Sequence, residues 1–267
     1  MKKKIYINEP VSIWIYKFIA YIYVKFFLHY KFKGKYRFKK DEKIVVLSNH
    51  QTDMDPFLVR LHLNRYMYSL SSDNIYSRKW LAKQITKVGG IPKRKGIPDF
   101  ESIKTLLEVS KDGGSVLIFP EGNRSYAEFQ FYIADNFASL IKKLKSTLVL
   151  YNIHGGFGKC PRFGRKHRKG KFYGEVRQIL KYEEYKDMPV SELTNIIRDN
   201  IRVFDSESGE LYKNNKKAEY LERMFFVCPK CGTKEELVSQ GNVIRCNHCG
   251  LEVNYNEDLS LSSKDKD

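Results

Sequence analysis

Two residues near position 50 have the types and spacing that acid–base chemistry needs. His50 and Asp55 stand five positions apart, directly after an apolar run. A hydroxyl is a poor nucleophile at neutral pH, so it attacks a carbonyl only when a nearby base removes its proton. Imidazole can be that base, and a carboxylate on its other nitrogen fixes the tautomer and stabilises the imidazolium. The pair could therefore transfer an acyl group onto a hydroxyl, with Asp55 as orienting group and Asp53 as the other nearby carboxylate.

Two further segments supply cations for an anionic substrate. Arg94 closes the segment 88–94, and Arg124 lies on the segment 119–125. Guanidinium forks suit bidentate binding of phosphate, so we expect both to hold a phosphate near His50. Glu121 could order its loop, pair with an arginine or bond a substrate hydroxyl; a plain surface turn with one salt bridge is the alternative. The candidate substrate-binding residues are Lys93, Arg94, Glu121, Gly122 and Arg124.

Strand and helix patterns alternate along the chain, which predicts an α/β domain that would position these residues. The expected strands cover 43–48, 91–94, 115–119, 147–153 and 170–180, and the expected helices cover 55–63, 74–88, 99–110, 135–145 and 189–203. His50 then lies on a strand-to-helix loop. Asp55 is also expected at the N-cap of the next helix, ahead of Pro56, and an N-cap alone would be a purely structural role.

The N-terminal region is apolar and aromatic between residues 11 and 28, and only Lys17 and Lys25 interrupt it. Basic residues flank it on both sides, from Lys2 to Lys4 and from 31 to 40. This pattern favours a helix lying in a membrane interface; a membrane span and an ordinary helix covering the main domain are the alternatives. The formal net charge of +17 indicates an anionic partner, either a membrane surface or nucleic acid.

Three segments resemble the glycerolipid acyltransferases when they are taken as a set, specifically the 1-acyl-glycerol-3-phosphate acyltransferase group. They read NHQTDMD, GGIPKR and FPEGNRS. The resemblance implies that His50 is the catalytic base, Asp55 orients it and Arg94 binds phosphate. Asn123 stands where the family has threonine, and 147–156 lacks the proline of the family's fourth motif. The implied fold is a central mixed sheet flanked by helices, with an N-terminal membrane-binding segment. The implied donor is an acyl thioester on coenzyme A or acyl carrier protein.

Two Cys-x-x-Cys pairs near the C-terminus predict a zinc ribbon, which the family pattern does not include. Each pair is followed by a glycine that permits a tight turn, and 14 residues separate the pairs. Four thiolates close the coordination sphere, so the zinc should be structural. His248, between two ligands, is expected to be exposed, and Cys160 has no assigned role. The ligands are Cys228, Cys231, Cys246 and Cys249.

These patterns divide the chain into an N-terminal membrane-associating segment (1–40), an acyltransferase domain (41–204), a charged linker (205–224), a zinc ribbon (225–255) and a disordered tail (256–267). The basic run 162–169 should touch lipid headgroups or an acidic carrier protein, or be a solvated loop. The leading hypothesis is a 1-acylglycerol-3-phosphate O-acyltransferase that converts lysophosphatidic acid to phosphatidic acid at the cytoplasmic face of the cell membrane. The alternatives are another lysophospholipid or glycerol 3-phosphate as acceptor, or a nucleic-acid-binding protein, although nucleic acid fits the aromatic N-terminus poorly.

Overall fold

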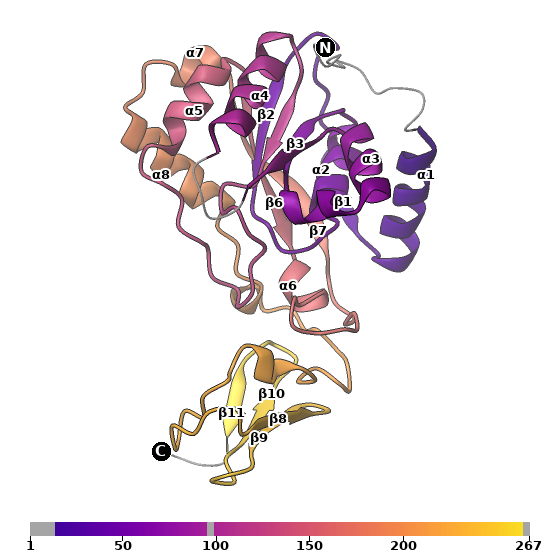
Figure 1. The fold of residues 1–267 in the computed structure, drawn as a ribbon, viewed down its shortest axis with the longest axis vertical. Coiled ribbons are helices and arrows are strands. Elements are labelled where there is room, and N and C mark those ends of the chain that lie inside the picture. The colour runs from indigo at the N-terminus through magenta and orange to yellow at the C-terminus, as the bar shows by residue number, and fades with distance from the viewer. Residues whose placement is uncertain (1–13, 95–98, 264–267) are drawn as a thin grey trace.

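A seven-stranded mixed sheet forms the centre of the larger domain in the computed structural model, which describes residues 14–94 and 99–263 (Figure 1). The strand order is β1-β7-β6-β2-β5-β3-β4. Neighbouring strands run parallel except β6 and β7, which are antiparallel. The strands are β1 (Lys31–Lys33), β2 (Ile44–Ser48), β3 (Tyr68–Ser72), β4 (Gly90–Lys93), β5 (Val116–Ile118), β6 (Thr147–His154) and β7 (Tyr173–Leu180). The α/β class and the central mixed sheet expected from the sequence are confirmed.

Helices cover both faces of this sheet, which is why its central strands are apolar throughout. Val45 and Leu47 of β2 point into the core formed with α4, α5 and α8, whereas Ile44 and Val46 point into the core formed with α2 and η2. Successive side chains of a strand alternate in this way between two faces. The helices are α1 (Trp14–Ile22), α2 (Asp55–Leu63), α3 (Lys79–Lys87), α4 (Phe100–Lys111), α5 (Phe137–Leu144), α6 (Gly156–Lys159), α7 (Tyr182–Tyr185) and α8 (Val190–Ile201). A π-helix, η2 (Tyr23–Phe27), follows α1, and the 3₁₀ helices are η3 (Asp73–Ser77), η4 (Ser206–Ser208) and η5 (Leu221–Arg223).

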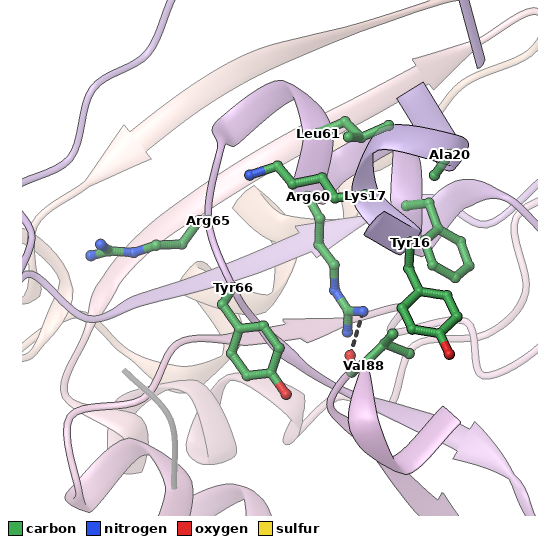
Figure 2. Close-up of a pocket in the computed structure, with 9 residues that line it drawn as sticks. Tyr16, Lys17, Ala20, Arg60, Leu61, Arg65, Tyr66 and Val88 are labelled. Carbon is green, nitrogen blue, oxygen red and sulfur yellow. Dashed lines mark hydrogen bonds between the residues drawn. The ribbon is translucent and has the colours of Figure 1, made fainter. Parts of the chain in front are cut away.

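The N-terminal helix α1 lies on the flank of the domain beside α2 and α3 (Figure 1). Tyr16 donates to Gln84 Oε1 at 2.7 Å, and Lys17 donates to Asn64 Oδ1 at 2.7 Å. Figure 2 shows the small hollow that remains between α1 and α2, with the Arg60 guanidinium donating to the Val88 carbonyl at 2.6 Å. Polar contacts therefore fasten α1 to the domain.

Most large side chains of α1 and η2 point away from the domain. Trp14, Ile15, Phe18, Ile19, Phe26 and Phe27 are each more than half exposed, whereas Ala20, Val24 and Leu28 are buried. Among the described residues, no helix is both long and apolar enough to cross a membrane. The basic flank Lys2 to Lys4 lies outside the described residues. The interfacial helix expected from the sequence stays a prediction.

A four-stranded antiparallel sheet forms the C-terminal ribbon, at the end of the molecule beyond α6 (Figure 1). Its strands are β8 (Leu237–Gln240), β9 (Val243–Cys246), β10 (Glu252–Tyr255) and β11 (Leu261–Ser263). The expectation of a disordered tail from residue 256 is corrected here, because β11 pairs with β10. Its last four residues, 264–267, lie outside the described part of the chain.

The segment expected to be a charged linker packs between the domain and the ribbon. Tyr212, Ala218 and Leu221 are buried, and they share one apolar cluster with Phe157 and Phe163 of the domain. The same cluster contains Cys228 and Cys246 of the ribbon. Apolar side chains at intervals within the charged sequence therefore tie the ribbon to the domain.

Candidate active site

His50 and Asp55 lie together at the carboxyl end of β2, as their spacing predicts. His50 Nδ1 is 2.8 Å from Asp55 Oδ2. The imidazole stacks on the Phe119 ring, with 4.2 Å between ring centroids, and it keeps partial exposure to the cleft. An imidazole whose Nδ1 faces a carboxylate presents Nε2 as its basic atom. The pair thus has the geometry that proton abstraction requires.

Asp55 is not an N-cap, which corrects one expectation from the sequence. Met54 occupies that position, and Asp55 is the first residue of α2, fully buried. Its Oδ2 accepts from the backbone N–H groups of Gln51 at 2.6 Å and Thr52 at 2.9 Å, and Oδ1 accepts from Thr52 Oγ1 at 2.5 Å. These donors compensate the buried charge and fold the loop so that the carboxylate faces His50.

Two further side chains hold the loop that carries His50. The Asn49 amide donates to the Ile153 carbonyl and accepts from the Ile153 N–H, both at 2.8 Å, so it pairs with β6 as another strand would. Glu121 Oε1 accepts from the His50 N–H at 3.4 Å and Oε2 accepts from the Phe131 N–H at 3.3 Å. Burial raises the pKa of Glu121 to about 7. Of the three roles left open by the sequence, these two hydrogen bonds fit loop ordering.

A cleft of about 660 Å³ opens at this edge of the sheet. The parallel strands β2, β5, β3 and β4 all end there, which is the usual place for a binding site in such a sheet. The cleft is lined by His50, the apolar side chains of Leu70, Ile75, Ile118 and Phe119, and the cations Lys93, Arg94, Arg124 and Arg162. A negatively charged head and an apolar chain could both be accommodated beside the imidazole.

The two arginines expected to bind phosphate both line this cleft, but each has a different setting. Arg124 Nη1 pairs with Asp53 Oδ2 at 2.8 Å, so Asp53, the other carboxylate near His50 in the sequence, contacts an arginine. Arg94 is more than half exposed, and its backbone N–H donates to Asp99 Oδ2 at 2.8 Å. Lys93 precedes Arg94 at the end of β4, and Gly122 lines the cleft with a left-handed φ of +69°. Such a φ favours glycine, so this loop is shaped by backbone as well as by side chains.

Several residues of the site were not singled out in the sequence. Thr52 completes the shell around Asp55, and Phe119 supports the imidazole. Arg162 comes from the basic run 162–169 and reaches the cleft, where its Nη1 donates to the Arg124 carbonyl at 3.2 Å. The position of Phe119 at the end of an expected strand and the closeness of Thr52 to Asp55 in the sequence offered signals, whereas the Arg162 contact joins segments 38 residues apart.

The four ribbon cysteines converge as their spacing predicts. Their sulfur atoms lie within 4.8 Å of one another, with Cys228 Sγ 3.7 Å from Cys249 Sγ and Cys231 Sγ 3.8 Å from Cys246 Sγ. A tetrahedral zinc thiolate site with Zn–S bonds of about 2.3 Å requires sulfur pairs about 3.8 Å apart. The donor set therefore fits a closed, structural zinc site, and no disulfide joins these cysteines.

Comparison with known proteins agrees with this division of the chain. Residues 29–160, which include His50 and most of the cleft, match the family model described as "Acyltransferase". Residues 221–257 match a zinc-ribbon model described as "DNA directed RNA polymerase, 7 kDa subunit".

One similar solved structure is the 1-acyl-sn-glycerophosphate (LPA) acyltransferase PlsC from Thermotoga maritima. The two structures superpose with a TM-score of 0.55 at 16% sequence identity, over 70% of this chain and 78% of that one. At this identity the likeness establishes the fold, and the choice of acceptor is a separate question.

Proposed function

We propose that this protein transfers a fatty acyl group from a thioester to the free hydroxyl of lysophosphatidic acid, and so makes phosphatidic acid. The main observation in support is the His50–Asp55 pair, with 2.8 Å between Nδ1 and Oδ2, at the wall of a cleft lined by cations. A 1-acylglycerol-3-phosphate O-acyltransferase needs this combination, because its acceptor carries a phosphate close to the reacting hydroxyl.

His50 acts as the general base in this proposal. Its Nε2 removes the proton of the acceptor hydroxyl while the hydroxyl oxygen bonds to the thioester carbonyl carbon. Asp55 stabilises the imidazolium, and the proton then passes to the departing thiolate as the carbon–sulfur bond breaks. Since the acyl group moves directly onto the acceptor, no serine or cysteine of the protein is acylated.

The cations position the acceptor. Arg94 and Arg124, with Lys93, hold the phosphate, and Glu121 and Gly122 shape the loop beside it. Arg124 is already fixed by Asp53 at 2.8 Å, so little side-chain freedom is lost when substrate binds. Positioning of two reactants can supply several kcal/mol of the rate enhancement. The acceptor could also be another lysophospholipid or glycerol 3-phosphate, since each offers an anion.

The exposed aromatic surface of α1 and η2 supports work at a membrane. Trp14, Phe18, Phe26 and Phe27 are each more than half exposed. Aromatic rings beside lysines suit the interface of an anionic bilayer, and lipid substrates are found there. We place the protein at the cytoplasmic face of the cell membrane, bound to its surface.

Acyl transfer by purified protein in detergent tests the proposal. Lysophosphatidic acid, glycerol 3-phosphate and lysophosphatidylcholine are each offered with acyl-coenzyme A and with acyl carrier protein donors. We expect phosphatidic acid from wild type and none above background from His50→Ala, whose fold is checked by circular dichroism. A folded His50→Ala protein with wild-type turnover would refute the role of His50. Wild-type transfer to another acceptor alone would refute the choice of lysophosphatidic acid.

The ribbon gives one specific reason to keep a second candidate, a nucleic-acid-binding protein. Residues 221–257 match a family model described by an RNA polymerase subunit, and the chain is strongly basic. This candidate predicts binding to DNA or RNA that weakens steeply with salt, because each phosphate contact releases a counterion. Fluorescence anisotropy at several salt concentrations measures it.

A further inference from the structure

The cleft beside His50 continues toward the ribbon through two more hollows. A second hollow of about 340 Å³ shares Asp53, Arg124 and Arg162 with the cleft. A third hollow of about 250 Å³ shares residues of the loop 161–166 with the second, and its far wall comes from the segment 216–220. The three hollows therefore follow one another, through shared lining residues, from the imidazole to the segment 216–220.

The third hollow contains two buried cations, and among the described residues one half-buried carboxylate, Glu257, acts on Lys217. Arg168 is 3% exposed and Lys217 is 6% exposed, and both line it. Arg168 donates to three neutral groups, the Gly158 carbonyl at 3.3 Å, the Tyr255 hydroxyl at 3.4 Å and the Lys217 carbonyl at 2.9 Å. Lys217 Nζ donates to the Asn214 carbonyl at 3.1 Å. Burying cations is costly unless an anion compensates them, so this wall is suited to a bound anion.

More cations stand at the rim of the same hollow. Arg165 stacks on the Tyr220 ring, with 4.6 Å from guanidinium carbon to ring centroid; Arg223, which is outside the lining, also stacks on that ring, at 4.5 Å. Tyr220 has a left-handed φ of +72°, which a residue with a side chain adopts only when its surroundings hold it there. Lys216 is paired with Glu219 at 2.9 Å, the acidic residue of the lining. The rim therefore presents a fixed guanidinium above the buried cations.

We propose that the third hollow binds a phosphate group on the carrier end of the acyl donor, while the thioester end reaches His50 through the second hollow. This inference rests on the proposed function, because only a long donor would need both ends of the path. Several cations around one hollow, arginines among them, suit phosphate better than a single carboxylate. An acidic protein or a nucleic acid could touch the exposed Arg165, but its bulk would not enter a hollow walled by Arg168 and Lys217. A lipid headgroup offers the same phosphate chemistry, and the experiment separates the two sources.

Direct binding tests the site without acyl transfer. Isothermal titration of the zinc-loaded, full-length protein uses inorganic phosphate, adenosine 3′,5′-bisphosphate, which has the phosphates of coenzyme A, and vesicles containing phosphatidic acid. We expect the bisphosphate to bind wild type. Arg165→Glu should lower the affinity for the bisphosphate about ten- to a hundredfold, which corresponds to the loss of one charge-assisted hydrogen bond. Lys169→Glu is the matched control, because Lys169 lies in the same exposed loop but outside the lining of the third hollow.

A second variant separates loss of phosphate binding from loss of folding stability. Lys217→Met removes a buried charge and keeps the length of the side chain, so we expect an unchanged or higher melting temperature without ligand. The same variant should lose the gain in melting temperature that the bisphosphate gives to wild type. In transfer assays Arg165→Glu should raise KM for acyl-coenzyme A about tenfold or more. It should leave KM unchanged for an acyl-pantetheine donor that lacks phosphate.

Unchanged bisphosphate affinity in both Arg165→Glu and Lys217→Met would overturn the site. Binding confined to phosphatidic acid vesicles or to RNA would overturn its assignment to the donor. Phosphate binding without any acyl transfer would refute the proposed function and leave the phosphate site standing. Acyl transfer without phosphate binding would refute the site alone.

Discussion

Replacing Asp55 with asparagine should slow catalysis while leaving the loop folded. The amide oxygen can take the position of Oδ2, which faces His50 Nδ1 at 2.8 Å and accepts from two backbone N–H groups. The amide nitrogen can donate to Thr52 Oγ1, which lies 2.5 Å from Oδ1. The bonds to Oδ2 are kept and the one to Thr52 is reversed, with the hydroxyl accepting instead of donating, so the main loss is the negative charge. Two charges about 4 Å apart near a protein surface interact by about 4 kcal/mol, and a neutral dipole keeps part of that.

We therefore expect the barrier to rise by about 2–4 kcal/mol, which lowers kcat about 30- to 1000-fold. Release of the free thiol from the donor, followed by absorbance, measures kcat, and thermal unfolding measures stability. The melting temperature should change little. Asp55→Ala is the comparison variant, because it leaves the buried donors of Gln51 and Thr52 without an acceptor and should cost about 3 kcal/mol of stability or more. Wild-type kcat in a folded Asp55→Asn protein would show that the carboxylate only builds the turn.

Three other perturbations follow from the same contacts. Burial raises the pKa of Glu121 to about 7 from an ordinary 4.5, so the neutral carboxyl stabilises the folded protein fully below pH 4.5, and this stabilisation is lost as the pH rises to 7. In urea unfolding across that window, the free energy of unfolding of wild type should fall by up to about 3 kcal/mol relative to that of Glu121→Gln, and parallel curves would contradict this. Arg124→Ala should raise KM for lysophosphatidic acid about tenfold or more in steady-state assays, and an unchanged KM would exclude phosphate contact. Little stability should be lost, because the carboxylate partner of Arg124, Asp53, is 81% exposed. Removing zinc with a chelator should lower the melting temperature of the whole chain, since Cys228 and Cys246 share a core with Phe157 of the domain. If hydrogen exchange shows a loss of amide protection in the ribbon alone, this coupling is disproved.

The strongly patterned elements could be predicted from the sequence, and the weakly patterned ones could not. The apolar strands β2, β5 and β6 and the helix α4, with Asp99 capping it through the Ser102 N–H, lie close to their predicted positions. The strand β3 was missed because its sequence YSLSS is half polar, and its pairing with β4 and β5 defines it. The strand β1, sequence KFK, is a short edge strand beside β7. Long-range pairing decides such segments more than intrinsic preference does.

The same distinction holds within the candidate site. The separation of His50 and Asp55 along the chain is short, so local turn geometry could bring them together and the sequence predicted the pairing. The position of Glu121 against the His50 backbone depends on how β2 and β5 lie side by side, so its role stayed open. Arg162 reaches the cleft from a loop after β6, and no local pattern distinguishes it from the other cations of that run.

The packing around α6 makes the ribbon part of the structure that holds His50. The buried Asp205 accepts from the N–H groups of Gly155 at 2.6 Å and Gly158 at 2.9 Å, so the segment leading to the ribbon fixes both ends of this short helix. The adjoining Gly156 N–H donates to Gln51 Oε1 at 2.9 Å, and the Gln51 N–H donates to Asp55. These hydrogen bonds, joined through the backbone of Gly155 and Gly156 and through Gln51, connect Asp205 with the proposed catalytic carboxylate. Because one wall of the third hollow is the segment 216–220, which packs against the ribbon, a loosened ribbon should weaken donor binding before it disturbs the pairing of His50 with Asp55.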